Sequence, residues 1–200
     1  MILKDKIYGL VLAGGKSTRM GQDKGLLSYH GKPQREHLYE MLSSVCDKAF
    51  MSIRKEQEPE ISVKFNVIID KDEYKGPYNG LLSAYKAHPD AAWLVLACDL
   101  PLMDVASLKE LIVSRNAKRN LLSTAFALKE NPLPEPLCAI WEPEALKESL
   151  TYLEAGNGSC PRKYLINSDV ELVFPTNEHA LLNANSVEDY KEALEKIAVS

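Results

Sequence analysis

The chain has 200 residues, of which 46% are hydrophobic and 26% are charged, and these proportions exclude a globally disordered protein. Its 24 basic and 28 acidic side chains give a net charge of −4 without a long basic run, which argues against binding of nucleic acid or of an anionic membrane surface. We find neither an apolar run that could span a bilayer nor a secretion signal, and therefore expect a cytoplasmic protein with reduced cysteines.

Short apolar runs alternate with amphipathic segments along the chain. The run WLVLAC within residues 92–98 predicts a strand that is buried on both faces. Ser186 to Asp189 form a capping-box pattern that begins a helix. In chain order, the pattern predicts a strand at 7–12, a helix at 34–45, strands at 48–54 and 63–70, a helix at 79–88, a strand at 92–98, a helix at 105–116, strands at 121–128 and 137–141, a helix at 144–154, a strand at 170–174 and a final helix from 187.

Strands that alternate with helices predict an α/β fold with a mostly parallel sheet. A length of 200 residues favours a single domain over residues 1–200. Sheets of this kind bind ligands at the carboxyl ends of their strands. The loops after residues 12, 70 and 98 are therefore the places where a functional site is expected.

The loop after the first predicted strand combines glycines with cations and hydroxyls. Its sequence, LAGGKSTRMGQDKG over residues 12–25, does not match a P-loop, because Leu10 stands where the first glycine is required. The Rossmann pattern also fails, because Gly14 and Gly15 are adjacent. Backbone amides beside one or two cations form an anion nest, so we expect this loop to bind a polyphosphate. The side chains that would supply further donors are Lys16, Ser17, Thr18, Arg19 and Lys24.

Two aspartates follow predicted strands directly. Asp99 comes after the buried strand, where a carboxylate can hold Mg²⁺ together with substrate phosphates. Asp104 precedes the next predicted helix and is assigned as its N-cap. Asp70 ends an earlier strand, and two interpretations stay open for it. It reads a base edge or supports the metal, or it belongs to an ordinary turn at the strand end.

The stretch LAGGKSTRMGQDK, followed by GKPQREH, resembles the nucleotidyltransferase signature of molybdenum cofactor guanylyltransferases. The resemblance continues in VIID, in GP with a glycine three residues on, in ACDLP, in EPL and in NANSVEDY, in the expected order. It implies a three-layer Rossmann-like nucleotidyltransferase fold with a mostly parallel central sheet. The implied reaction joins GTP to molybdopterin, releases pyrophosphate and depends on Mg²⁺.

The resemblance also implies roles for individual residues. It implies that Arg19 and Lys24 bind the nucleotide's phosphates, that Asp70 lies near the nucleoside and that Asp99 carries Mg²⁺. The residues that it places against the nucleotide are Leu12, Ala13, Gly14 and Gly15, and those that it places near the pterin substrate or the metal are Asn183 and Asn185. Where the family often has an asparagine near the base, this chain has Ser52, Ile53 and Arg54.

A basic patch at residues 158–163 leaves two interpretations open: a site for the second substrate's phosphate, or a solvated loop that leads into a helix.

In the implied reaction the nucleophile is a phosphate monoester, which is already ionised at neutral pH and needs no general base. Catalysis then depends on positioning and positive charge, supplied by Arg19, Lys24 and Mg²⁺ on Asp99.

The alternatives within the superfamily are a cytidylyltransferase and a sugar-phosphate nucleotidyltransferase. A nucleotide-binding protein that has lost catalysis is an alternative of another class. We expect GTP and molybdopterin as substrates, no nucleic-acid or membrane partner, and a monomer or weak homo-oligomer.

Overall fold

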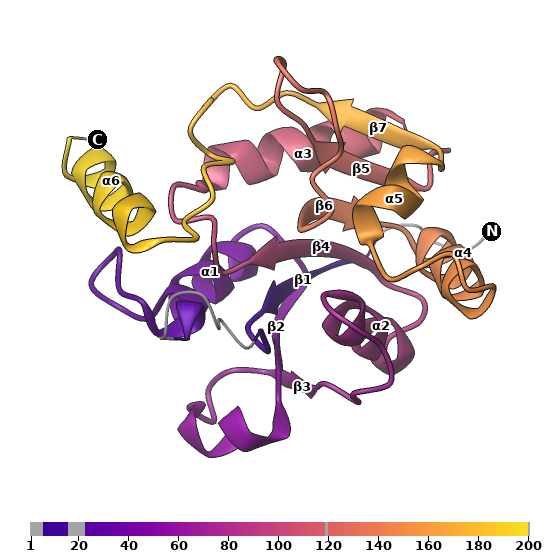
Figure 1. Ribbon diagram of the computed structural model, residues 1–200, viewed down its shortest axis with the longest axis horizontal. Coiled ribbons are helices and arrows are strands. Elements are labelled where there is room, and N and C mark those ends of the chain that lie inside the picture. Colours follow the sequence, from indigo (N-terminus) through magenta and orange to yellow (C-terminus); the bar gives the residue numbers. More distant parts are fainter. Residues whose placement is uncertain (1–5, 16–22, 119, 200) are drawn as a thin grey trace.

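The computed structural model describes residues 6–15, 23–118 and 120–199, and it contains one seven-stranded sheet (Figure 1). The strand order is β3-β2-β1-β4-β6-β5-β7. Strand β6 runs antiparallel to its neighbours β4 and β5, and all other neighbouring strands are parallel. The α/β fold with a mostly parallel sheet is therefore confirmed. The strands are β1 (Ile7–Leu12), β2 (Lys48–Ile53), β3 (Val67–Ile69), β4 (Ala92–Ala97), β5 (Ser123–Phe126), β6 (Cys138–Trp141) and β7 (Val170–Val173).

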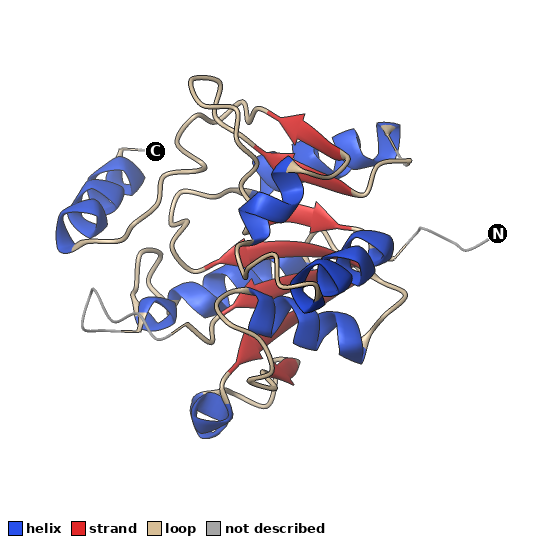
Figure 2. Ribbon diagram, turned by 45° about the vertical axis from the view of Figure 1, so that its right-hand side comes forward, coloured by secondary structure: helices blue, strands red, loops and turns tan. Residues whose placement is uncertain are grey.

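Helices cover both faces of the sheet and make three layers (Figure 2). Helices α1 and α3 share one apolar core with one face of the sheet, and α2, α4 and α5 share the second core with the other face. The helices are α1 (Gln34–Ser43), α2 (Tyr78–Ala87), α3 (Val105–Ala117), α4 (Pro143–Glu154), α5 (Pro161–Ile166) and α6 (Val187–Ala198), with short 3-10 helices η1 (Lys24–Leu26) and η2 (Lys55–Glu60).

The central strands are buried on both sides, as their continuous apolar sequences predict. Every residue of β4 is buried, and its side chains alternate between the two cores. Leu94 and Leu96 pack toward α1 and α3, whereas Trp93 and Val95 pack toward α2 and α4. A strand with helices on both faces excludes water from its whole length except its ends. Polar groups that serve a ligand must therefore lie at the ends of β4.

Two predicted strands are shorter than their apolar runs suggest. The run at 63–70 forms a strand only over Val67–Ile69, and Val63 is fully exposed. The run at 121–128 pairs only over Ser123–Phe126. Strand β3 lies at one edge of the sheet and β5 lies next to the other edge, and apolar composition alone overestimates the length of both.

The C-terminal helix α6 lies to one side of the three layers (Figures 1 and 2). Ser186 accepts a hydrogen bond from the Asp189 N–H, which confirms the capping box, and Asp104 likewise caps α3 through the Ser107 N–H. Tyr190 of α6 packs on Tyr29 with ring centroids 4.9 Å apart. Among the described residues, no helix has both the length and the apolar character needed to cross a membrane.

Candidate functional site

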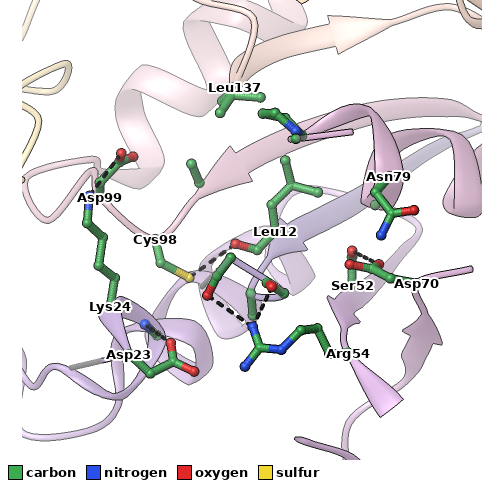
Figure 3. A pocket seen from close by; sticks show the side chains of 18 of the residues that line it. Leu12, Asp23, Lys24, Ser52, Arg54, Asp70, Asn79, Cys98, Asp99 and Leu137 are labelled. Carbon is green, nitrogen blue, oxygen red and sulfur yellow. Dashed lines mark hydrogen bonds and ion pairs between the residues drawn. The ribbon is translucent and has the colours of Figure 1, made fainter. Parts of the chain in front are cut away.

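A cavity of about 450 Å³ opens at the carboxyl ends of the parallel strands β1, β2, β3 and β4 (Figure 3). This is the edge of the sheet at which the sequence predicts a ligand site. Side chains and backbone from six stretches of the chain meet there, and four of the stretches follow parallel strands that end at one edge. The lining includes Leu12, Ala13, Gly14, Gly15, Asp23, Lys24, Ser52, Arg54, Asp70, Asp99 and Leu137.

One end of the cavity is formed by a charged cluster that joins three distant segments. The Lys24 Nζ lies 3.5 Å from Asp99 Oδ2 and donates a hydrogen bond of 2.5 Å to Asn185 Oδ1. The side chains of Lys24 and Asp99 are 18% and 24% exposed, so the pair is accessible without being fully solvated. The Ala184 N–H donates to the backbone oxygen of Asp99 at 2.8 Å and fixes the C-terminal segment to this loop. Three residues assigned from the resemblance thus lie together.

The other end of the cavity is formed by Asp70 and Ser52. Figure 3 shows them on the opposite side of Leu12 from Lys24 and Asp99. The Ser52 hydroxyl donates to Asp70 Oδ1 at 2.5 Å. Burial raises the pKa of Asp70 to about 6, against the opposing effect of the Ser52 hydrogen bond. A carboxyl group that is half buried at a cavity wall is suited to accept hydrogen bonds from a ligand.

The backbone approaches this pair so closely that a side chain at Gly14 has no room. A Cβ at Gly14 would collide with Asp70 Oδ2, whereas a Cβ at Gly15 would meet nothing within 4 Å. Glycine is therefore suited to positions 14 and 15 for different structural reasons. Gly14 allows the close approach of β1's end to Asp70, and Gly15 leaves open space at the same edge.

We expect Gly14→Ala to destabilise the protein by about 1–3 kcal/mol, because the new methyl group must displace the Asp70 carboxylate. Each kcal/mol lowers the thermal midpoint of a chain of this size by roughly 2–4 °C. Thermal denaturation of Gly14→Ala beside Gly15→Ala measures the effect, and only the first midpoint should fall. Equal midpoints for the two variants would contradict this account of the close approach.

Arg54, which lines the cavity, and Gln57, which lies behind its wall, were not singled out as site residues by the sequence. Arg54 Nη1 donates to the carbonyl oxygens of Gly14 and Gly15, at 2.5 and 3.1 Å. The buried Gln57 donates to the Ala13 carbonyl and to the Asp23 carboxylate. Arg54 stands directly after β2, at the ligand edge, in the stretch that the resemblance places near the base. No pattern in the charged segment 55–60 indicates a buried amide.

The remaining predicted residues are placed as follows. Arg19 lies outside the described residues, as do Lys16, Ser17 and Thr18. Asn183 Nδ2 donates to the Leu181 carbonyl at 3.1 Å, and the structure brings only Asn185 to the charged cluster.

The basic patch at 158–163 leads into helix α5, which begins at Pro161. Within it, Arg162 Nη2 forms an ion pair of 2.6 Å with Glu135 Oε2, and its Nε donates to the Pro134 carbonyl at 3.1 Å. The patch is therefore tied to the EPL segment that precedes β6.

The donor groups at the charged cluster fit Mg²⁺. The Asp99 carboxylate and the Asn185 amide oxygen both face the Lys24 ammonium group, so two hard oxygen donors already surround one positive charge. Mg²⁺ prefers oxygen ligands and commonly uses one or two carboxylates with substrate phosphates and waters. Within residues 6–15, 23–118 and 120–199, no group of three or more His, Cys, Asp or Glu side chains could hold a metal ion. A magnesium ion at Asp99 would thus take some of its oxygen ligands from the phosphates of a bound nucleotide.

Comparison with known sequences connects the chain to molybdenum cofactor proteins. A family model described as the MobA-like NTP transferase domain matches residues 9–170. The chain is 36% identical over 185 residues to the molybdenum cofactor biosynthesis bifunctional protein of Synechocystis sp., with 92% of this chain and 52% of that protein covered. It is 32% identical over 184 residues to the molybdenum cofactor guanylyltransferase of Pseudomonas fluorescens, with 90% and 89% covered. The chain thus spans about half of the first relative and nearly all of the second.

Comparison with solved structures supports the fold. The molybdopterin-guanine dinucleotide biosynthesis protein A of Archaeoglobus fulgidus superposes with a TM-score of 0.79 and 21% identity. The match covers 96% of this chain and all of that one. At this identity the likeness shows the fold, and it confirms the three-layer nucleotidyltransferase architecture implied by the sequence motifs.

Proposed function

The chain belongs to the MobA-like NTP transferase family, and we propose that it transfers GMP from GTP to molybdopterin with release of pyrophosphate. The observation that carries the proposal is the arrangement of two unlike ends in one cavity, with Lys24 and Asp99 at one end and Asp70 at the other. The names of the relatives support the choice of GTP and molybdopterin. The wall between the ends, proposed to contact the nucleotide, is formed by Leu12, Ala13, Gly14 and Gly15.

In the proposed reaction, an oxygen of the molybdopterin phosphate attacks the α-phosphorus of GTP. The bond from that phosphorus to the oxygen bridging the α- and β-phosphates breaks, and pyrophosphate leaves with its electron pair. A phosphate monoester is ionised at neutral pH, so no residue has to remove a proton. The difficulty is to bring two anions together, and a cationic site lowers that barrier.

The residues of the charged cluster have proposed roles that follow from this difficulty. Lys24 neutralises phosphate charge, and Asn185 holds its ammonium group beside Asp99. Mg²⁺, when bound by Asp99, supplies further positive charge to the phosphate oxygens. Arg19 is proposed, by the resemblance alone, to hold the leaving phosphates with its forked guanidinium group.

The end of the cavity at Asp70 supports the preference for guanine. Guanine presents an N1–H and an N2 amino group on one edge, and a carboxylate can accept from both. Cytosine and adenine do not offer this pair of donors. Leaving a buried polar group without a partner is costly, so a carboxylate at the cavity wall favours the base that offers it donors. We propose that Asp70, oriented by Ser52, makes this contact.

The raised pKa of Asp70 predicts a pH-dependent affinity for GTP. Because the ionised carboxylate is the acceptor, we expect the affinity to fall as pH decreases through about 6, by roughly tenfold per pH unit below it. Asp70→Asn should bind GTP weakly and lose this part of the pH dependence. Calorimetric titration of both proteins between pH 5 and pH 8 separates the Asp70 contribution from the titration of GTP itself, because GTP titrates identically in both series. Parallel pH profiles would contradict the assignment.

The raised pKa of Asp70 also predicts how the stability of the protein without ligand depends on pH. The folded-state pKa lies above the ordinary value of 3.8, so burial disfavours the charged form. Stability from this group is therefore present at low pH and is lost as pH rises from about 4 to about 6. A variant that cannot ionise at position 70 should gain stability relative to the wild type across this window.

The function is tested by thermal denaturation with Mg²⁺ and each of GTP, CTP, UTP, ATP and dTTP. A nucleotide at 100 times its dissociation constant adds about 2.7 kcal/mol, equal to a shift of roughly 5–11 °C in a chain of this size. A response to GTP, followed by pyrophosphate release when molybdopterin is added, is the expected result. A response to CTP would instead favour the cytidylyltransferase alternative. GTP binding without pyrophosphate release in the presence of molybdopterin would indicate a nucleotide-binding protein without this activity.

We further propose a Mg²⁺-dependent enzyme that acts in the cytoplasm as a monomer or weak homo-oligomer. The four cysteines, Cys46, Cys98, Cys138 and Cys160, are all free thiols, as a reducing compartment maintains them.

A further inference from the structure

A buried glutamine lies directly behind the cavity wall. Gln57, on the 3-10 helix η2, is 4% exposed. Its Nε2 donates to the Ala13 carbonyl at 3.0 Å and to Asp23 Oδ2 at 2.9 Å, and its Oε1 accepts from the Arg54 N–H at 2.9 Å. An amide nitrogen has two hydrogens, so both donors of Gln57 are used on these two partners.

The partners of Gln57 are the two flanks of the glycine-rich segment. Ala13 directly follows β1 on one side, and Asp23 precedes Lys24 on the other. Asp23 uses its second carboxylate oxygen to accept from the Gly25 N–H at 2.9 Å, which fixes the start of η1. The position of Lys24 therefore depends on Gln57 through one intermediate residue.

The same segment of chain also holds the glycines themselves. Arg54, at the start of η2, donates to the carbonyl oxygens of Gly14 and Gly15. A carbonyl oxygen carries partial negative charge and repels a phosphate group. By binding both oxygens, the Arg54 guanidinium removes that repulsion from the cavity wall, and Gln57 holds the backbone of Arg54 in place.

A hydrogen bond that only stabilises a protein core joins groups that lie away from any ligand site. The three hydrogen-bond partners of Gln57 instead all line the cavity, and they are Ala13, Asp23 and Arg54. We propose that Gln57 is a positioning residue, which aligns Ala13, Gly14 and Lys24 on the phosphates of the bound nucleotide. This inference rests on the proposed nucleotide site and adds a residue that touches no substrate itself.

The test uses a variant of the same shape. Gln57→Glu keeps the acceptor for the Arg54 N–H but replaces the donor with an oxygen that faces the Asp23 carboxylate and the Ala13 carbonyl. We expect the KM for the nucleotide to rise about ten- to hundredfold, as misplacement of binding groups by about 1 Å can produce. The KM for the acceptor should change little. Glu58→Gln, an exposed change on the same 3-10 helix, is the matched control.

A second substitution tests the specific bond. Asp23→Asn in the Gln57→Glu background allows the amide at position 23 to donate to the carboxylate at position 57, and it keeps an oxygen for the Gly25 N–H. The nucleotide KM should then recover in part. Two results would overturn the inference. One is a wild-type nucleotide KM in Gln57→Glu. The other is a loss of activity in Gln57→Glu that only follows the unfolded fraction measured by circular dichroism.

The test of Gln57 can be distinguished from the test of the proposed function. If a nucleotide other than GTP stabilises the wild type, the guanylyl assignment fails, and the Gln57 variants are compared by their affinity for that nucleotide. If none of the five nucleotides binds the wild type, the phosphate-positioning role is overturned together with the proposed function.

Discussion

Replacing Asp99 with asparagine should lower turnover by at least roughly hundredfold while the fold is retained, the size of effect seen when one group that stabilises transition-state charge is lost. The carboxylate lies two residues after the end of β4 and beside Lys24, where it would hold Mg²⁺ against the phosphates. The bond from the Ala184 N–H to the backbone oxygen of Asp99 does not involve the side chain and is kept in the variant. Pyrophosphate release at saturating GTP and molybdopterin, measured over a Mg²⁺ titration, gives the loss.

The matched control for this variant is Asp104→Asn, five residues further along the chain. Asp104 caps α3 through the Ser107 N–H, and asparagine is as good a cap as aspartate. Its turnover should stay close to that of the wild type. If Asp99→Asn also kept wild-type turnover at every Mg²⁺ concentration, Asp99 would have no role in holding the metal.

Removing the carboxylate of Glu142 should destabilise the protein more than Gly14→Ala does. Arg115 Nε and Nη2 donate to the two oxygens of Glu142 at 2.6 and 3.0 Å, and both side chains are only 5% exposed. The pair joins α3 to the residue that precedes α4. Breaking a buried ion pair costs about 3–5 kcal/mol, because the buried arginine has then lost the two charge-assisted hydrogen bonds to the carboxylate. Urea denaturation of Glu142→Ala at pH 7 measures this loss.

An exposed pair supplies the comparison. Lys118 and Glu171 lie 2.7 Å apart, and the lysine side chain is 55% exposed. Exposed pairs contribute about 0–1 kcal/mol, so Glu171→Gln should change stability little. Replacing both Arg115 and Glu142 with apolar residues should cost less than Glu142→Ala alone, since neither charged group is then buried. A Glu142→Ala variant as stable as Glu171→Gln would contradict the expected contribution of this buried pair.

Much of the fold follows from local sequence patterns because its elements are regular. The apolar run before Asp99 fits only a strand covered on both faces, and the caps at Asp104 and Ser186 are local hydrogen-bonding motifs. The ligand edge follows in turn, because parallel strands end together. The direction of β6 did not follow from its composition. Its only signal is the short connection from β5, since 127–137 contains no crossover helix.

The site was predictable where a residue stands at a strand end and obscure where its role depends on tertiary contacts. Lys24 and Asp99 carry local signals of their own, and the resemblance adds Asn185. Gln57 lies in the charged segment KEQEPE, which is typical of a solvated surface. Its burial results from the approach of Ala13 and Asp23, which are more than 30 residues away, and no local pattern encodes that approach. The role of Arg19 stays a prediction.

The direction of β6 brings a separate connection, residues 127–137, to the cavity wall. The sequence of this connection can change independently of the strand ends that form the rest of the wall. Because β6 runs against β4, its amino end lies beside the carboxyl end of β4, and Leu137 reaches the cavity from the connection that precedes it. That connection leaves the sheet and returns to it without crossing a helical layer. Its length and composition can change without moving the strands that carry Ser52, Asp70 and Asp99. Exchanging residues 127–137 for those of a relative should therefore alter the part of the cavity wall that Leu137 lines, while the strand ends that carry Ser52, Asp70 and Asp99 keep their geometry.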